Sequence, residues 1–398
     1  MFPQLKCLQN HYLVRPTQIL CCLFLVAALF PTDSAAFDKP IALKITSTDS
    51  PHILKANNFS LNARNVKTLK SQENLLWIGT SMGVIRYDTT TDEDLVVYDN
   101  RNGLLSNGIF SIEIGPEKKI WVGTYGGGLS HLDDTRWANL NTPNGLNDAF
   151  VYDLEFDNDV MWIATWSGAN RVRGNPLSKP SWESFTVENT DGGLIDNWVY
   201  AIEIGADGRI WFGTEAGLSL FDGVGWQNWD HEDGLGAAHE IVRKENRHIT
   251  DKLKGAHHAQ QASDLPNTKA NDYRPNYIVS MLLDQTNRLW MGTWGGGLSL
   301  FDPQTQTFRN FTAQDGLPGN YILALKEGPD GNLWIGSSKG LTRFDGKTFL
   351  NYSRINGLTS DFIFSIEFSA NHFLWVGGHH SVAQFKINPL SGELARLD

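Results

Sequence analysis

Five side chains suited to ligand binding stand at one repeated position of this chain, each of them four residues after a tryptophan. These residues are Tyr125, Trp166, Glu215, Trp294 and His379. Aromatic rings stack on the C–H faces of sugars, while carboxylate and imidazole groups bond to hydroxyls. The position therefore favours binding of a ligand such as a carbohydrate.

A second repeated position lies a few residues after a Gly-Leu pair and carries a polar side chain. It holds Asn107, Asp148, Asn197, Asn320 and Asp361. Amides and carboxylates supply the directed hydrogen bonds that a hydroxyl-rich ligand needs. We expect Asn107, Asn197 and Asn320 to take part in binding, with closure of a turn onto its own backbone as the alternative.

Catalysis would require an acid or a base among these residues. The candidates are Glu215, His379, Asp148 and Asp361, and no two of them have a recognisable catalytic spacing,. We therefore assign no catalytic residue and expect a binding protein more than an enzyme.

Metal and cofactor sites find little support in the sequence. The three cysteines, Cys7, Cys21 and Cys22, all lie within residues 1–36, so thiol chemistry and cysteine metal sites are excluded from the rest of the chain,. Several histidines gather in one polar insertion, where a solvated segment is favoured over a metal site. We expect no metal and no cofactor.

The elements that position these side chains follow a repeated motif of tryptophan, one apolar residue, and glycine or alanine. The motif occurs seven times, at Trp77, Trp121, Trp162, Trp211, Trp290, Trp334 and Trp375. A period of roughly 41 to 49 residues that carries short strand-like runs is typical of a β-propeller. The sequence predicts an all-β, seven-bladed β-propeller with four antiparallel strands per blade.

Packing accounts for the repeated tryptophans. Their large apolar faces are best buried between neighbouring sheets, and the glycine two residues later permits close approach. Closing the ring requires a strand from one end of the chain to pair with the last blade. We predict that residues 41–48 or 52–55 supply this strand.

One step of the repeat is longer than the others. Between Trp211 and Trp290, a polar insertion at about 236–275 separates a Gly-Leu pair from the next tryptophan,. Its middle, 237–261, contains no proline and is predicted to be helical,. We expect the insertion to emerge on the ligand-binding face, where it could act as a lid.

The first 36 residues have the composition of a secretory signal peptide. Basic residues precede an apolar run at 19–30, and small residues at 34–36 suit a signal peptidase,. We predict a periplasmic or secreted mature chain of residues 37–398 without membrane insertion, and keep an uncleaved anchor as the alternative. The formal net charge of −11 argues against binding to nucleic acid or to anionic membranes,.

The repeat also resembles a known family. Segments such as 311–320 (FTAQDGLPGN), 330–336 (DGNLWIG) and 340–345 (GLTRFD) are similar to the two-component regulator propeller repeat of bacterial hybrid histidine kinases. The resemblance covers about residues 60–387. It implies extracytoplasmic recognition, because in that family paired propellers bind a ligand, often a carbohydrate fragment, and signal to a kinase across the membrane.

A more distant resemblance is to the streptogramin lyases, which are also seven-bladed propellers. It implies chemistry that depends on a metal and a histidine base. The comparable closely spaced pair in this chain is His239-Glu240, inside the insertion.

From these observations we expect an extracytoplasmic ligand-binding or sensor-type propeller without a kinase domain of its own. Its ligand would be a glycan or small molecule at the channel face, or a protein partner, and a membrane signalling protein would receive the signal. A lyase or hydrolase acting on a natural product or polysaccharide is one alternative. A structural protein-interaction module is the other.

Overall fold

The structure, a computed structural model, describes residues 59–91, 95–133, 136–178, 180–246, 273–370, 372–387 and 394–395. These residues all fall within one compact unit, Leu43–Asp398. The predicted signal peptide at 1–36 and the predicted closing segments at 41–48 and 52–55 lie outside the described residues.

We number the repeats by their tryptophans, from Trp77 in repeat 1 to Trp375 in repeat 7. Repeats 1 to 6 each fold as a meander of four antiparallel strands. The innermost strands are β1 (Phe59–Gln72), β5 (Ile109–Ile114), β9 (Val151–Asp157), β13 (Val199–Ile204), β17 (Arg274–Leu283), β21 (Ile322–Glu327) and β25 (Ser365–Phe368). The tryptophans lie on the second strands, β2 (Leu75–Thr80), β6 (Ile120–Thr124), β10 (Val160–Thr165), β14 (Ile210–Thr214), β18 (Leu289–Trp294), β22 (Leu333–Ser337) and β26 (Phe373–Gly377).

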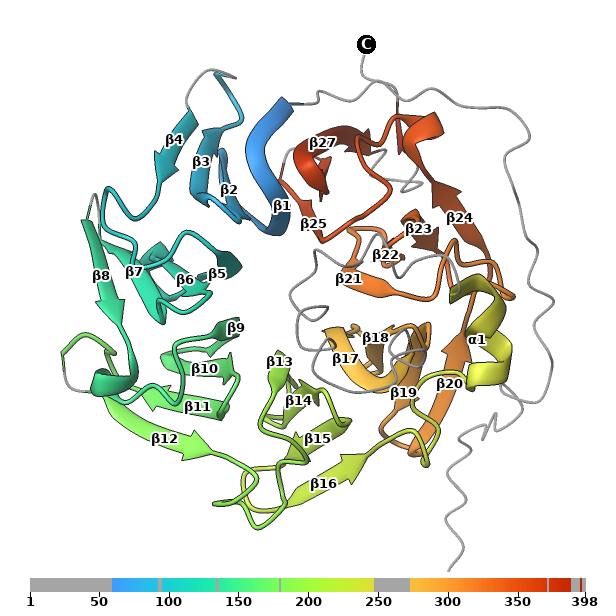
Figure 1. Cartoon of the computed structure of the whole chain (residues 1–398), viewed down its shortest axis with the longest axis horizontal. Coiled ribbons are helices and arrows are strands. Elements are labelled where there is room, and N and C mark those ends of the chain that lie inside the picture. Colours follow the sequence, from blue (N-terminus) through green and yellow to red (C-terminus); the bar gives the residue numbers. More distant parts are fainter. Residues whose placement is uncertain are drawn as a thin grey trace, which may run out of the picture. The chain divides into compact units, whose positions relative to one another are not determined.

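The outer strands complete each meander. The third strands are β3 (Gly83–Asp88), β7 (Leu129–Asp133), β11 (Gly168–Arg173), β15 (Leu218–Phe221), β19 (Leu298–Asp302), β23 (Gly340–Phe344) and β27 (His379–Ile387). The fourth strands are β4 (Leu95–Tyr98), β8 (Arg136–Leu140), β12 (Ser181–Phe185), β16 (Trp226–Trp229), β20 (Thr307–Phe311) and β24 (Phe349–Tyr352), and a short β28 (Leu394–Ala395) pairs with β27. The sheets stand around a centre toward which the innermost strands turn (Figure 1).

The prediction of seven separate blades is wrong. The described chain forms five four-stranded blades and one eight-stranded sheet, in the order β25-β26-β27-β1-β2-β3-β4 with β28 beside β27. The cause is the length of β1. Its first part pairs with β27 at Phe59 and Asn65, and its second part pairs with β2 from Val66 to Gln72, so the first and last repeats merge into one sheet.

The repeated tryptophans pack between sheets, as predicted. Trp334, for example, is fully buried and contacts Phe368 of the next repeat, with 6.1 Å between the ring centroids. A Cβ at Gly336, two residues after Trp334, would lie 2.8 Å from Ile363 at the start of the next repeat. Glycine at this point therefore allows neighbouring sheets to approach closely.

The insertion begins with a short helix, α1 (His239–Asn246), which is labelled in Figure 1. Gln314 Nε2, just after β20, donates to the Ile241 carbonyl of this helix at 2.8 Å. The remainder of the predicted helix lies outside the described residues. Val242 and Asn246 of α1 are buried. Asn246 Nδ2 donates to the Gly295 carbonyl at 2.8 Å, and Asn320 Nδ2 donates to Asn246 Oδ1 at 3.0 Å. This first part of the insertion is therefore anchored to repeats 5 and 6.

Candidate ligand-binding site at the channel

A central channel runs between the innermost strands. Residues from all seven of these strands line one cavity of about 450 Å³. This volume lies in the range of small-molecule sites. We call the end of the channel that is bordered by the loops between second and third strands the channel mouth.

Bulges aim one side chain into the channel from six of the seven inner strands. The register shifts near the start of β5, β9, β13 and β21, and in the middle of the longer strands β1 and β17. A bulge inserts an extra residue and re-aims its side chain. The extra residues that line the channel are Lys67, Phe110, Tyr152, Tyr200, Val279 and Leu323.

These bulge residues were missed from the sequence. A signal was present, because an apolar or aromatic side chain directly follows a buried valine or isoleucine in most of the inner strands, as in Ile109-Phe110 and Val199-Tyr200. Two such residues in succession break the alternation of a regular strand.

A set of residues that are all charged except Leu282 lies further along the channel, where each inner strand pairs with a repeated tryptophan. The register places there Lys70, Glu113, Glu155, Glu203, Leu282, Lys326 and Glu367. Lys70 forms an ion pair with Glu113, and Lys326 Nζ lies 2.7 Å from Glu367 Oε2. Glu155 of repeat 3 and Glu203 of repeat 4 belong to neither ion pair.

Burial alters the titration of those carboxyl groups. It raises the pKa of Asp153 to about 7 and that of Glu203 to about 7. Burial, together with the nearby Asp153 and Glu203 carboxylates, also raises the pKa of Glu155,. This side of the channel therefore changes its charge near neutral pH.

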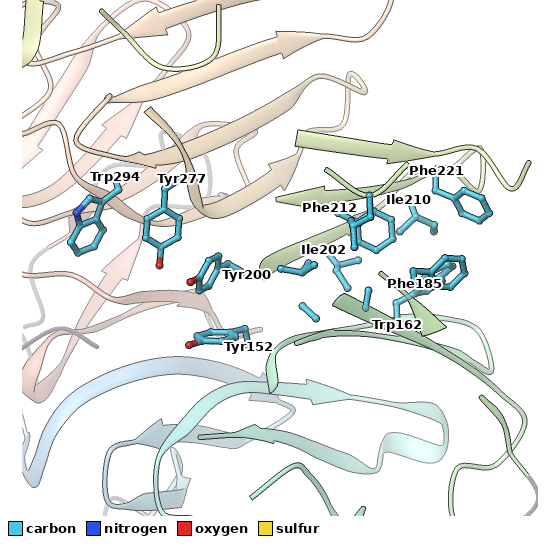
Figure 2. Close-up of a cluster of buried hydrophobic side chains, with 14 of the residues drawn as sticks. Tyr152, Trp162, Phe185, Tyr200, Ile202, Ile210, Phe212, Phe221, Tyr277 and Trp294 are labelled. Carbon is cyan, nitrogen blue, oxygen red and sulfur yellow. The ribbon is translucent and has the colours of Figure 1, made fainter. Parts of the chain in front are cut away.

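Aromatic rings form a continuous belt at the channel mouth from repeat 2 to repeat 6. The aromatic belt consists of Phe110, Tyr125, Phe150, Tyr152, Trp166, Trp198, Tyr200, Tyr277, Trp294 and Tyr321. Successive ring centroids lie 4.5 to 5.8 Å apart. Figure 2 shows four of these rings, from Tyr152 to Trp294, following one another along an arc.

The three aromatic residues predicted to bind a ligand all belong to this belt but differ in exposure. Tyr125 is 39% exposed, whereas Trp294 is 9% exposed and packs between Tyr277 and Tyr321. Trp166 is intermediate and stacks on both Phe150 and Trp198. Binding by these residues stays a prediction, and Tyr125 is the one whose side chain a ligand can most readily reach.

Glu215, the acidic residue among those predicted to bind a ligand, contacts both Tyr200 of the aromatic belt and Arg274. It forms an ion pair with Arg274, and Tyr200 Oη donates a hydrogen bond to Glu215 Oε2 at 3.3 Å. Burial raises the pKa of Glu215, and the Arg274 guanidinium opposes this shift,. Arg274 lies at the end of the insertion, as the first residue of β17, and was not identified from the sequence.

His379 lies in a different part of the mouth. Its Nδ1 is 2.7 Å from Asn65 Oδ1, and its ring centroid is 5.0 Å from that of Phe362 and 4.9 Å from that of Phe364. Lys67 Nζ lies 4.6 Å from the centroid of Phe364. His379 thus belongs to the junction of repeats 7 and 1 and is not a member of the aromatic belt.

The predicted amides hold the loops that carry them. Each accepts a hydrogen bond from an earlier backbone N–H of its own loop: Asn107 from Asn100 at 2.7 Å, Asn197 from Val187 at 2.8 Å and Asn320 from Ala313 at 2.9 Å. Asn276 and Asp361 repeat this bond in repeats 5 and 7. Turn closure accounts for this position, and a role of the amides in binding stays a prediction.

The four candidate acids and bases are divided among separate places. Glu215 pairs with Arg274, whereas Asp148 Oδ2 accepts a hydrogen bond from Ser167 at 2.8 Å. His379 and Asp361 line a common pocket between repeats 6 and 7. The described residues contain no group of three or more histidine, cysteine or acidic side chains that could hold a metal ion. Within the same residues, no helix has the length and apolar character needed to cross a membrane.

The ring of sheets and its ligand-sized channel define a β-propeller with a candidate binding face. The family model of the two-component regulator propeller matches three segments of this chain, residues 193–216, 272–295 and 316–339. The resemblance found in the sequence is thereby confirmed.

One curated relative is designated a histidine kinase. Histidine kinase P4 of Formosa agariphila is 24% identical over 307 residues, which make up 72% of this chain and 20% of that protein. The chain thus spans about a fifth of the length of this curated relative.

Solved structures share the fold. The extracellular domain of a B. thetaiotaomicron protein designated a hybrid two component system matches with a TM-score of 0.65 and 19% identity, over 83% of this chain and 41% of that chain. Virginiamycin B lyase from Staphylococcus aureus matches with a TM-score of 0.56 and 11% identity, over 83% of this chain and 98% of that chain. At these identities the similarity concerns the fold.

Proposed function

We propose that this chain is an extracytoplasmic sensor-type propeller that recognises a saccharide at the channel mouth. The observation that carries the proposal is the aromatic belt, whose Tyr125 is 39% exposed and whose Tyr200 bonds to Glu215 of the Glu215–Arg274 pair. Sugars bind between apolar ring faces and directed polar groups, because their C–H faces are apolar and their hydroxyls need partners.

The relatives support the sensing part of this proposal. One is designated a histidine kinase, and another is an extracellular domain of a two component system. By analogy with them, occupancy of the mouth would be passed to a membrane signalling partner, and the chain would work in the periplasm or outside the cell.

Titration calorimetry with neutral oligosaccharides selected on a glycan array tests the binding site. Tyr125→Ala should weaken binding by roughly 1 to 3 kcal/mol through the loss of a stacking face. Tyr125→Phe keeps the ring and should bind nearly as well as the original protein. Thermal melting of both variants should match that of the original protein, because Tyr125 is 39% exposed.

A matched control lies at the opposite end of the strands. Val224 is 95% exposed in the turn between β15 and β16, so Val224→Ala should change neither binding nor melting. If Tyr125→Ala and Val224→Ala bind every selected oligosaccharide equally well, the aromatic belt is not the recognition site.

A further inference from the structure

A second cavity lies between repeats 6 and 7, next to the end of the aromatic belt, since the Ser338 N–H donates to the Tyr321 carbonyl at 3.1 Å. It has a volume of about 620 Å³ and is lined by residues that include Ser338, Lys339, Arg354, Asp361, Phe362 and His379. These side chains come from the turn before β23, the turn Arg354–Asn356, the segment before β25 and the first residue of β27. We call this cavity the 6–7 pocket.

The 6–7 pocket carries two exposed cations. Among the residues that the structure describes, neither Lys339 nor Arg354 forms an ion pair, although the chain has a net charge of −11. The aliphatic part of Lys339 lies over Gly319, where a Cβ would be 3.2 Å from its Cδ. Asp361 is the one carboxylate lining the pocket, and its Oδ1 accepts the Arg354 backbone N–H at 3.0 Å. Lys339, Arg354 and Asp361 together therefore give the lining one formal positive charge.

A buried hydroxyl in the lining lacks a partner. Ser338 is 3% exposed, and its Oγ makes no hydrogen bond in the described part of the chain. A buried polar atom without a partner costs stability, so such atoms are uncommon unless a ligand or water satisfies them. Ser338 therefore offers an unused hydrogen-bonding group in the wall of this pocket.

An aromatic surface completes the lining. The rings of Phe362 and His379 lie 5.0 Å apart, and the bond between His379 and Asn65 fixes the imidazole. A Cβ at Gly378 would lie 2.6 Å from Ser360. Glycine at this position therefore allows the segment before β27 to approach the segment before β25 closely. The pocket thus combines a ring face, hydroxyls and a positive charge.

We propose that the 6–7 pocket binds a carboxylate-bearing sugar unit, such as a hexuronate. Its carboxylate would be held by Lys339 and Arg354, its hydroxyls by Ser338 and Asp361, and its C–H face by Phe362. This site is separate from the aromatic belt, so the inference does not depend on the proposed function of the belt.

Titration of the full chain with D-glucuronate, with D-glucose as the neutral comparison, tests the assignment. Glucuronate should bind in the millimolar range and weaken as salt is raised, whereas glucose should bind at least about tenfold more weakly. The double variant K339Q/R354Q should lose about a hundredfold in affinity, since each cation supplies one charge-assisted contact. Lys347→Gln, an exposed cation in the turn between β23 and β24, is the matched control and should bind normally.

Ser338→Ala separates a binding role from a structural one. Removal of an unpartnered hydroxyl should leave the melting temperature unchanged or raise it, while glucuronate affinity falls about tenfold. A lower melting temperature with unchanged affinity would assign Ser338 to the fold and overturn its role as a ligand contact. The site itself is refuted by equal affinity for glucose and glucuronate, by unaltered binding of K339Q/R354Q, or by no binding at tens of millimolar glucuronate.

Discussion

The channel mouth has two arcs that differ although the backbone repeats around the ring. Four residues after the tryptophan, repeats 2 to 5 carry Tyr125, Trp166, Glu215 and Trp294, and this belt arc is filled by packed rings. The pocket arc, repeats 6, 7 and 1, carries Ser338, His379 and Ser81 and contains the 6–7 pocket. Side-chain size at one repeated position therefore decides where the mouth is filled and where it is hollow.

The channel below shows a parallel difference. Under the pocket arc, lysines from repeats 1 and 6 pair with carboxylates from neighbouring repeats. Under the belt arc, Asp153, Glu155 and Glu203 lie close together, and burial raises the pKa of each of them. The two arcs thus differ in electrostatics as well as in packing.

The largest effect is expected inside the belt arc itself. Trp294→Ala should lower the free energy of unfolding by about 3 to 5 kcal/mol, because it leaves a cavity between Tyr277 and Tyr321,. Tyr125→Ala, at the exposed end of the same belt, should cost less than about 1 kcal/mol. Urea unfolding of both variants measures the difference. An equal loss of unfolding free energy in the two variants would contradict the difference in burial between Trp294 and Tyr125.

A smaller effect is expected where α1 covers the boundary of the two arcs. Asn246→Ala should cost about 1 to 3 kcal/mol, because it leaves the Gly295 carbonyl and the Asn320 amide buried without their partner,. Glu240→Ala on the exposed side of α1 is the control and should be nearly neutral. Chemical denaturation would contradict anchoring of the insertion if the two variants were equally stable.

Removing a carboxylate should change the stability of the protein in opposite directions in the two arcs. Burial raises the pKa of Glu203 from its usual 4.5 to about 7, so between these values the folded chain binds a proton that the unfolded chain has released. Stability therefore falls as pH rises through this window, and Glu203→Gln should raise the melting temperature at pH 8 but not at pH 4.

The matched change in the paired set is Glu113→Gln. It removes the partner of Lys70 and should lower the melting temperature at pH 8,. Melting curves at the two pH values decide the point, and a stabilising Glu113→Gln or a destabilising Glu203→Gln would remove the electrostatic contrast between the arcs.

The smallest effect is expected from chelation, which should leave both arcs unchanged. The described residues hold no cluster of metal ligands, so dialysis against EDTA should not shift the melting temperature,. A clear drop after dialysis, restored by adding back a divalent cation, would show that one arc depends on a metal.

Much of each repeat could be predicted from local sequence. The four strands predicted for each repeat are present in repeat 6, where β22 and β23 are joined across Ser338 and Lys339. The tryptophans are buried, and the glycines after them permit close approach. These features depend on short-range alternation, turn chemistry and side-chain size, which a single repeat already contains.

Tertiary structure alone decided three features. These are the number of separate sheets, the hydrogen bonds that the predicted amides make, and how far each aromatic residue of the channel mouth is exposed. β1 serves two repeats because ring closure brings it beside β27, a strand that is remote in sequence. Trp294 is buried and Tyr125 is exposed, although both follow the same motif, because their neighbours come from different repeats. The sequence by itself therefore determined the repeated unit and its packing residues. The assembled ring decided which equivalent positions are covered, because burial depends on contacts between residues far apart along the chain.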